Sequence, residues 1–181
     1  MTSSNLNNHS NDIKQRLIAV GGIHVFESQT PCKLVRAEPE GALKDLEWVD
    51  TLTLEARSEG DAEVMCGSEK ISLKMAAPAR LEINLPDDDN PADIHLNKPF
   101  KAQARLYDNQ GRELEVGKFT NFEWTPSEIL EVANDPSAGE FGFCDTCFGL
   151  HNFRAIKPGK GLIVARLGGL EGKLMIEAKS S

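Results

Sequence analysis

The stretch Lys101-Ala-Gln-Ala-Arg-Leu-Tyr-Asp-Asn-Gln-Gly-Arg112 indicates the fold class, because its apolar and polar residues alternate until a turn interrupts them. A period of two predicts a strand with one buried and one solvated face, and residues 108–111 predict the hairpin turn that ends it. Turns recur about every ten residues, a spacing typical of a β-sandwich. The other strands of this half are predicted at 80–85, 122–127, 129–132 and 162–167, with a last one ending at Ala178.

The first half of the chain shows the same pattern. Residues 51–57 alternate polar and apolar side chains, and turns containing Gly follow at 58–61 and 67–69. No stretch favours a helix longer than a turn or two, so the sequence predicts an all-β protein. The strands predicted in this half are 23–26, 32–37, 51–57, 62–66 and 70–75.

Composition divides the chain into a leader and two units. Residues 1–16 are rich in Ser and Asn and predict a flexible polar leader, with a weak helical signal at 12–16. A first unit is predicted over 17–77 and a second over 78–181. Proline and small side chains at 76–79 predict a stiff joint, so the two units are expected to stand end to end.

The second unit carries an ordered set of motifs: Ala-x-Ala-x-Leu-x-Asp-x-x-Gly, then Trp-x-x-Ser, then a Val, then Ala-x-x-x-Gly-x-Gly before a strand. The residues that carry them are Ala102, Ala104, Leu106, Asp108, Gly111, Trp124, Val132, Ala155, Gly159, Gly161 and Ala165. In this order they resemble the bacterial immunoglobulin-like domains of the BIG2 family over residues 80–178. The resemblance implies an immunoglobulin-like sandwich with Trp124 as its large buried ring, and a non-catalytic role. Together with a shorter unit of the same kind at 17–77, it predicts a tandem of two immunoglobulin-like β-sandwich domains.

One segment departs from the family pattern, because residues 134–153 are inserted where the family passes directly from one strand to the next turn. A connection of this length is unusual for a solvated loop. Its four phenylalanines are either contacts for a partner, presented on a pinned loop, or rings that fold back to cap the core. These candidates are Phe141, Phe143, Phe148 and Phe153.

Cys144 and Cys147 lie within this insertion, and three interpretations compete for them. A disulfide between them would pin the loop, and this interpretation is favoured. A redox pair would need a lowered thiolate pKa, for which no neighbouring signal exists. A zinc site would use Cys144, Cys147 and His151, with a fourth ligand from elsewhere in the chain.

Cys32 and Cys66 fall in different predicted strands of the first unit. An immunoglobulin-like sandwich often places such a pair face to face between its two sheets, where a bridge stabilises by about 3–4 kcal/mol. The bridge is expected in an exported protein; otherwise both residues are buried thiols that pack as small apolar side chains.

Several functional classes find no support in the sequence. The formal net charge of −8 argues against a nucleic-acid partner, and no run approaches the roughly 18 apolar residues of a membrane helix. No secretory signal is recognisable in residues 1–12. Gly-x-Ser-x-Gly, phosphate-cradling and His-Glu-x-x-His motifs do not occur, so we expect neither an enzyme nor a cofactor, and no small-molecule substrate.

The interpretation that fits these observations is a non-enzymatic structural or adhesive module whose partners are other proteins of a larger assembly. Its expected location is extracellular, at a bacterial cell surface, or periplasmic. Two alternatives remain open: a structural component of a phage virion or appendage, and a metal-binding or redox protein that uses the CxxC motif of the insertion.

Overall fold

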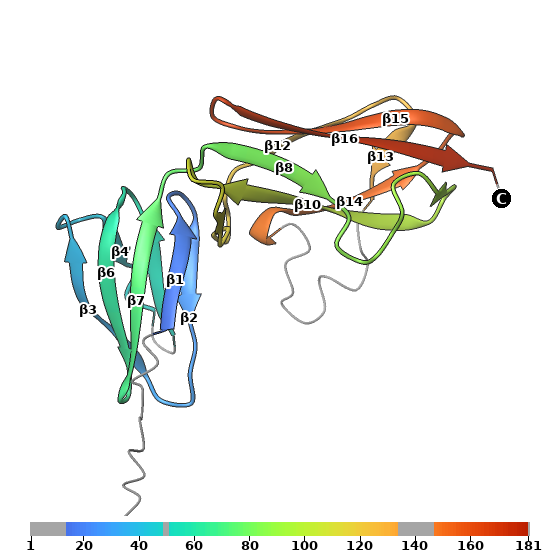
Figure 1. Cartoon of the computed structure of the whole chain (residues 1–181). Helices are drawn as coiled ribbons and strands as arrows, with labels where there is room; N and C mark the ends of the chain where they lie inside the picture. The colour runs from blue at the N-terminus through green and yellow to red at the C-terminus, as the bar shows by residue number, and fades with distance from the viewer. Residues whose placement is uncertain (1–13, 49–50, 134–146, 181) are drawn as a thin grey trace, which may run out of the picture.

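The computed structural model describes residues 14–48, 51–133 and 147–180, and this part of the chain is all-β. Its only helical element is the short 3-10 turn η1, Cys147–Gly149. The strands form two stacks that follow one another in sequence and meet at a junction (Figure 1).

The first stack is built from seven strands in two facing sheets. One sheet has the order β1-β7-β6-β3, with β1 parallel to β7, and the other has the order β2-β5-β4. The strands are β1 Lys14–Ala19, β2 Ile23–Phe26, β3 Cys32–Glu38, β4 Leu43–Asp45, β5 Leu52–Ala56, β6 Gly60–Cys66 and β7 Glu69–Ala76.

The second stack contains nine strands. In one sheet, β8 pairs with one edge of β10, and β11 and β14 pair with its other edge. Strand β13 pairs in turn with the far edge of β14. The facing sheet has the order β12-β15-β16-β9, with β9 parallel to β16. The strands are β8 Arg80–Asn84, β9 Ile94–His95, β10 Pro99–Tyr107, β11 Glu113–Leu114, β12 Glu123–Pro126, β13 Leu130–Val132, β14 Leu150–Ala155, β15 Gly159–Leu167 and β16 Leu170–Lys179.

Both stacks follow the strand order of an immunoglobulin sandwich, in which strands A, B, E and D face strands C, F and G. In the second stack β8-β10-β14-β13 corresponds to the first group and β12-β15-β16 to the second. In the first stack β2-β5-β4 corresponds to B, E and D, and β3-β6-β7 to C, F and G. The described part of the first stack has no counterpart of β8.

Each stack encloses its own hydrophobic cluster. The first includes Leu54, Val64 and Met75, all of which are buried. The second centres on Phe153, which is fully buried and lies 6.2 Å from Phe100 between ring centres. Complete burial of such side chains contributes about 1.5–3 kcal/mol each, which makes these clusters the main stabilising feature of each stack.

Most of the predicted strands are confirmed, including all five of the first half and the hairpin after β10. Two expectations are wrong. Residues 14–16 belong to β1 rather than to a leader or a helical turn, because parallel pairing with β7 orders them. Trp124 is only partly buried, because β12 lies at an edge of its sheet, so Phe153 takes the central place in the core.

The expectation that the units stand end to end is also wrong. The strands of the two stacks run in different directions in Figure 1, and the connection at 77–79 is not the only link between them. Ala19 and Ala76, at the ends of β1 and β7, are buried in the hydrophobic cluster of the second stack. The junction is therefore a packed interface rather than a spacer.

Candidate functional site

The junction is held by residues 115–118 of the second stack, whose backbone binds β1 and β2 on either side of the turn that joins these two strands. Glu115 N donates to Leu17 O at 2.9 Å, and Ala19 N donates to Glu115 O at 3.0 Å. On β2, Ile23 N donates to Lys118 O at 2.8 Å and Lys118 N donates to Ile23 O at 2.7 Å. Because these bonds join backbone to backbone, they fix position more firmly than flexible side chains would.

A salt bridge reinforces the same contact. The Arg16 guanidinium donates from Nε and Nη2 to the two carboxylate oxygens of Glu115, both at 2.8 Å. The arrangement is bidentate, which gives directional specificity. Both side chains are partly exposed, so the pair contributes no more than about 1 kcal/mol.

Beside this contact lies a hollow of about 960 Å³, here called the junction hollow. Residues of both stacks line it, which makes it a feature of the junction rather than of either sandwich. The lining residues are Arg16, Val25, Glu27, Trp48, Thr51, Lys118 and Phe148.

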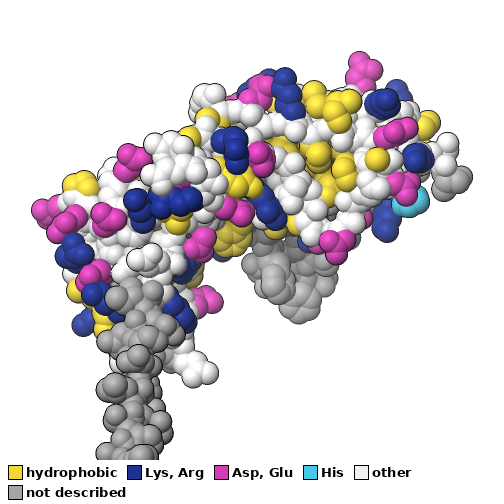
Figure 2. Space-filling view, viewed as in Figure 1, with side chains coloured by type: hydrophobic (Ala, Val, Ile, Leu, Met, Phe, Trp, Pro, Cys, Tyr) yellow, Lys and Arg dark blue, Asp and Glu magenta, His cyan; other side chains and the backbone are white. Residues whose placement is uncertain are grey.

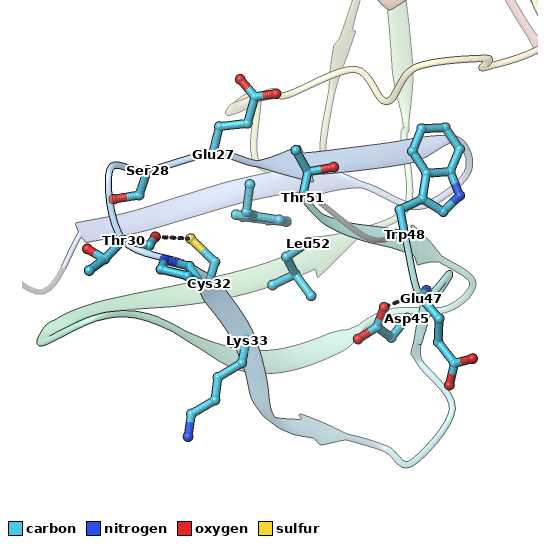
Figure 3. Close-up of a pocket in the computed structure, with 12 residues that line it drawn as sticks. Glu27, Ser28, Thr30, Cys32, Lys33, Asp45, Glu47, Trp48, Thr51 and Leu52 are labelled. Atoms are coloured by element: carbon cyan, nitrogen blue, oxygen red, sulfur yellow. Dashed lines mark hydrogen bonds between the residues drawn. The ribbon is translucent and has the colours of Figure 1, made fainter.

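A second hollow of about 530 Å³, here called the loop hollow, lies within the first stack (Figure 3). It shares Glu27, Trp48 and Thr51 with the junction hollow, so the two lie next to each other. In Figure 3, Cys32 and Trp48 stand toward opposite ends of the loop hollow, with Leu52 between them. At the Trp48 end, Glu47 N donates to Asp45 Oδ1 at 2.8 Å, which orders the loop that carries the indole.

Three aromatic side chains around the junction are exposed, and each lies at or directly after a residue with positive φ. Trp48 is 55% exposed, Phe119 is 62% exposed and Phe148 is 46% exposed. Phe119 and Phe148 themselves have positive φ, of 62° and 59°, and Glu47, which precedes Trp48, has φ 56°. Such a conformation costs about 1–3 kcal/mol for a residue other than glycine and concentrates at functional sites. The aromatic rings are therefore candidate contacts for a partner.

The described charged side chains on one face of the molecule are of mixed sign. On the face shown in Figure 2, acidic and basic side chains are interspersed over both stacks. Beneath the junction, burial lowers the pKa of His24, and its Nε2 lies 3.0 Å from Ala19 O. The neutral imidazole donates from Nε2 to that carbonyl, so this bond links β2 to the end of β1 without a buried charge.

Cys32 and Cys66 form a disulfide. Its placement corrects the expectation of a bridge between sheets, because the two residues are directly opposite each other on neighbouring strands β3 and β6 of one sheet. In immunoglobulin lettering these are strands C and F, whereas a bridge between sheets would join B and F. The pair Cys144 and Cys147 lies outside the described side chains, so its disulfide stays a prediction.

The four phenylalanine candidates separate into different groups. Phe153 is fully buried on β14, so the interpretation of this residue as a partner contact is wrong and it belongs to the core. Phe148 is exposed and lines the junction hollow, as a contact residue would. Phe141 and Phe143 lie outside the described residues.

His151 lies among aromatic rings, 5.5 Å from Trp124 and 4.9 Å from Phe153 between ring centres. Zinc at Cys144, Cys147 and His151 stays a prediction, because neither cysteine side chain is described. Within the part of the chain that the structure describes, no three His, Cys, Asp or Glu side chains are grouped to hold a metal ion. The described residues also form no helix with the length and hydropathy needed to cross a membrane.

Sequence reasoning did not single out Trp48 or residues 115–118. An isolated Trp in a polar stretch carries no periodic signal, and the residues between β11 and β12 resemble an ordinary loop. One cue was present, since Gly21, Gly22 and Gly117 supply the small residues that a close backbone contact requires.

No family model matches the chain, and no curated protein matches it. Among solved structures, domains 5–6 of the S-layer protein SbsC are 13% identical, with 94% of this chain and 95% of that chain covered and a TM-score of 0.39. FdeC, an Escherichia coli adhesin, is 13% identical, with 89% and 60% covered and a TM-score of 0.39. A titin Ig tandem is 11% identical, with 93% of each chain covered and a TM-score of 0.33. At these identities and TM-scores the likeness carries no argument about what this chain does.

Proposed function

We propose that the chain is a tandem of two immunoglobulin-like domains of the BIG2 type and works as a non-enzymatic structural or adhesive module. The boundary between the domains lies at 77–79, and the first domain begins with β1. The observation that carries the proposal is the set of backbone hydrogen bonds between residues 115–118 and strands β1 and β2, which sets the angle between the domains. A fixed angle serves a structural or presenting role, in which one surface must be held at a defined orientation.

The surface around the junction supports an interaction role. Exposed Trp48 and Phe148 line one hollow that both domains share. Aromatic side chains held on rigid backbone lose little entropy on binding and are frequent at the centres of protein interfaces. The partner is accordingly another protein of the assembly to which the module belongs.

The proposed location is a bacterial cell surface or the periplasm. Its support is the Cys32–Cys66 disulfide, since such bonds persist in oxidising compartments and are rare in the cytosol.

Antibody labelling of intact native cells, compared with permeabilised cells, tests the function and the location together. Antibodies against the folded chain should label intact cells or periplasmic fractions, where the protein should sediment as part of a larger complex. Labelling confined to the cytoplasm, with the protein sedimenting as a free monomer, would overturn the proposal.

A further inference from the structure

Strand β2 has one edge that its own sheet does not use. Hydrogen-bonded pairs alternate along an antiparallel ladder, so the bond from Ala56 N to Gly22 O at 3.4 Å fixes the phase of the pairing with β5. The backbone groups of His24 and Phe26 therefore face β5. Those of Ile23 and Val25 face away from it.

Only part of this outward-facing row of backbone groups is hydrogen-bonded. The backbone N–H and C=O of Ile23 both pair with the backbone of Lys118. Val25 is the next residue in the same row, and it has no backbone partner among the described residues. A row of unpaired N–H and C=O groups is a template for another extended chain.

The second domain shows what normally lies at this edge. Strand β10 occupies the same place in the fold as β2, and β8 covers its edge over five paired residues. Leu81 and Ile83 of β8 are buried against the core of that domain. The described residues of the first domain include no strand in the position of β8.

Open space lies beside the unpaired row. Val25 lines the junction hollow, together with Trp48 and Phe148. The Arg16 guanidinium lies over the ring of the core residue Phe26, 4.5 Å from the ring centre. An extended segment in the hollow would meet the side chains of Trp48 and Phe148 and the unpaired backbone groups of Val25.

We propose that a partner protein supplies the missing strand: an extended segment with apolar residues at alternate positions pairs with Val25 in the junction hollow. Backbone hydrogen bonds supply affinity in this mode of recognition, and alternate side chains supply specificity. The inference deepens the proposed interaction role, on which it rests, by naming the edge and the chemistry of its occupant.

The leader of this chain is the competing occupant, and its composition disfavours it. Seven of the first twelve residues are Asn or Ser. Asn is depleted in strands, and the leader has no apolar residues at alternate positions that would match Leu81 and Ile83 of β8.

The test selects binders from a displayed library of nine-residue peptides that carry Val, Ile, Leu or Phe at alternate positions. Selection uses the full chain, and hits are then measured against Val25→Pro, which removes the outward N–H but leaves the pairing with β5 in place. Val35→Pro is the matched control, because Val35 lies at the bulge of β3, another edge of the same domain. Melting of each variant establishes that it folds.

Support requires peptides that bind the wild type and the Val35→Pro variant alike, bind Val25→Pro at least tenfold more weakly, and slow hydrogen exchange at the Val25 amide. If Val25→Pro does not fold, an ester in place of the amide of Val25 removes the same N–H. Failure to enrich any peptide, or enrichment of peptides that bind both forms equally, overturns the proposal.

A variant that lacks residues 1–13 completes the test. If the Val25 amide exchanges slowly in the full chain and rapidly in this variant, the leader covers the edge and the partner proposal is wrong. Equal, rapid exchange in both supports an edge that is open to a partner. Surface labelling of native cells is independent of all these outcomes, so failure at this edge is distinguishable from failure of the proposed function.

Discussion

The backbones of Gly22 and Gly117 lie in direct contact at the junction. A Cβ on Gly117 would stand 2.9 Å from the carbonyl carbon of Gly22, and a Cβ on Gly22 would stand 3.0 Å from Gly117 Cα. Real Cβ atoms do not approach a backbone so closely without displacing it. The pair of glycines therefore permits residues 115–118 to reach the β1–β2 turn, and the angle between the two stacks depends on the absence of a side chain at both positions.

Gly117→Ala should open the junction. Overpacking costs typically about 1–3 kcal/mol, and here the strain falls on backbone atoms that have no alternative rotamer. Small-angle X-ray scattering should show a broader range of distances between the two stacks, with each stack still folded. Gly169→Ala is the control, since no atom lies within 4 Å of its added methyl group. Identical scattering profiles for the two variants would contradict a junction set by this contact.

Truncation of Phe153 to Ala should lower stability far more than truncation of Phe148 to Ala, because only Phe153 lies in the core. Removing the fully buried Phe153 side chain should lower the free energy of unfolding of the second stack by about 3–5 kcal/mol. Phe148 is 46% exposed, so its truncation should change that free energy by less than about 1 kcal/mol. Urea unfolding followed by Trp124 fluorescence, with Trp48 replaced by Phe in every variant, measures both. A large loss for Phe148→Ala would place its ring in the core instead of at the junction hollow.

Loss of the Cys32–Cys66 bridge should destabilise the first stack. The bridge closes a loop with a sequence separation of 34 residues, for which loop entropy predicts about 4 kcal/mol. The double variant Cys32→Ser/Cys66→Ala should lower the urea midpoint of the first stack and leave that of the second unchanged. Cys144→Ser/Cys147→Ser serves as the comparison. An unchanged midpoint in the first variant would show that the bridge contributes no stability.

Acidic pH should lower the free energy of unfolding, because His24 takes up a proton when the chain unfolds. Burial lowers its pKa below the ordinary 6.5, with a smaller contribution from Arg16, while Ala19 O and Glu115 oppose the shift. The unfolded chain therefore binds a proton that the folded chain does not, and stability falls as the pH drops below about 6.5. Urea midpoints between pH 7.5 and 5 should decline in the wild type.

The same decline should be smaller in His24→Gln and unchanged in His95→Gln, because His95 is exposed. Asp108 does not contribute in this range. Desolvation raises its pKa, but the N–H groups of Arg112 and Gln110 and the Arg112 guanidinium outweigh it and hold the pKa below 3.8. A flat profile in the wild type would contradict the role given to His24.

The insertion can be tested by counting thiols. Alkylation and intact-mass spectrometry of unreduced protein from its native source should add no label if Cys144 and Cys147 form the predicted bridge. Two labels would show free thiols at these positions, since Cys32 and Cys66 are joined. Labelling that appears only after a chelator is added would instead indicate zinc.

The all-β class and most strand positions followed from the sequence alone. Alternation along 101–107 and 51–57, and turn residues such as Gly111, act over a few residues, so a period of two is readable without knowledge of the fold. The disulfide partners Cys32 and Cys66 were also predictable as a pair, although not their position on neighbouring strands of one sheet.

The tertiary structure decided the junction and everything that depends on it. Contact between Gly22 and Gly117 joins residues 95 positions apart, and among the described residues no strand occupies, beside Val25, the place that β8 fills in the second stack. Phe148 and Phe153 are identical side chains five residues apart, yet Phe148 is exposed and Phe153 is buried, which the local sequence does not reveal. Local sequence sets which face of a strand is apolar, but distant segments determine which faces and edges remain uncovered.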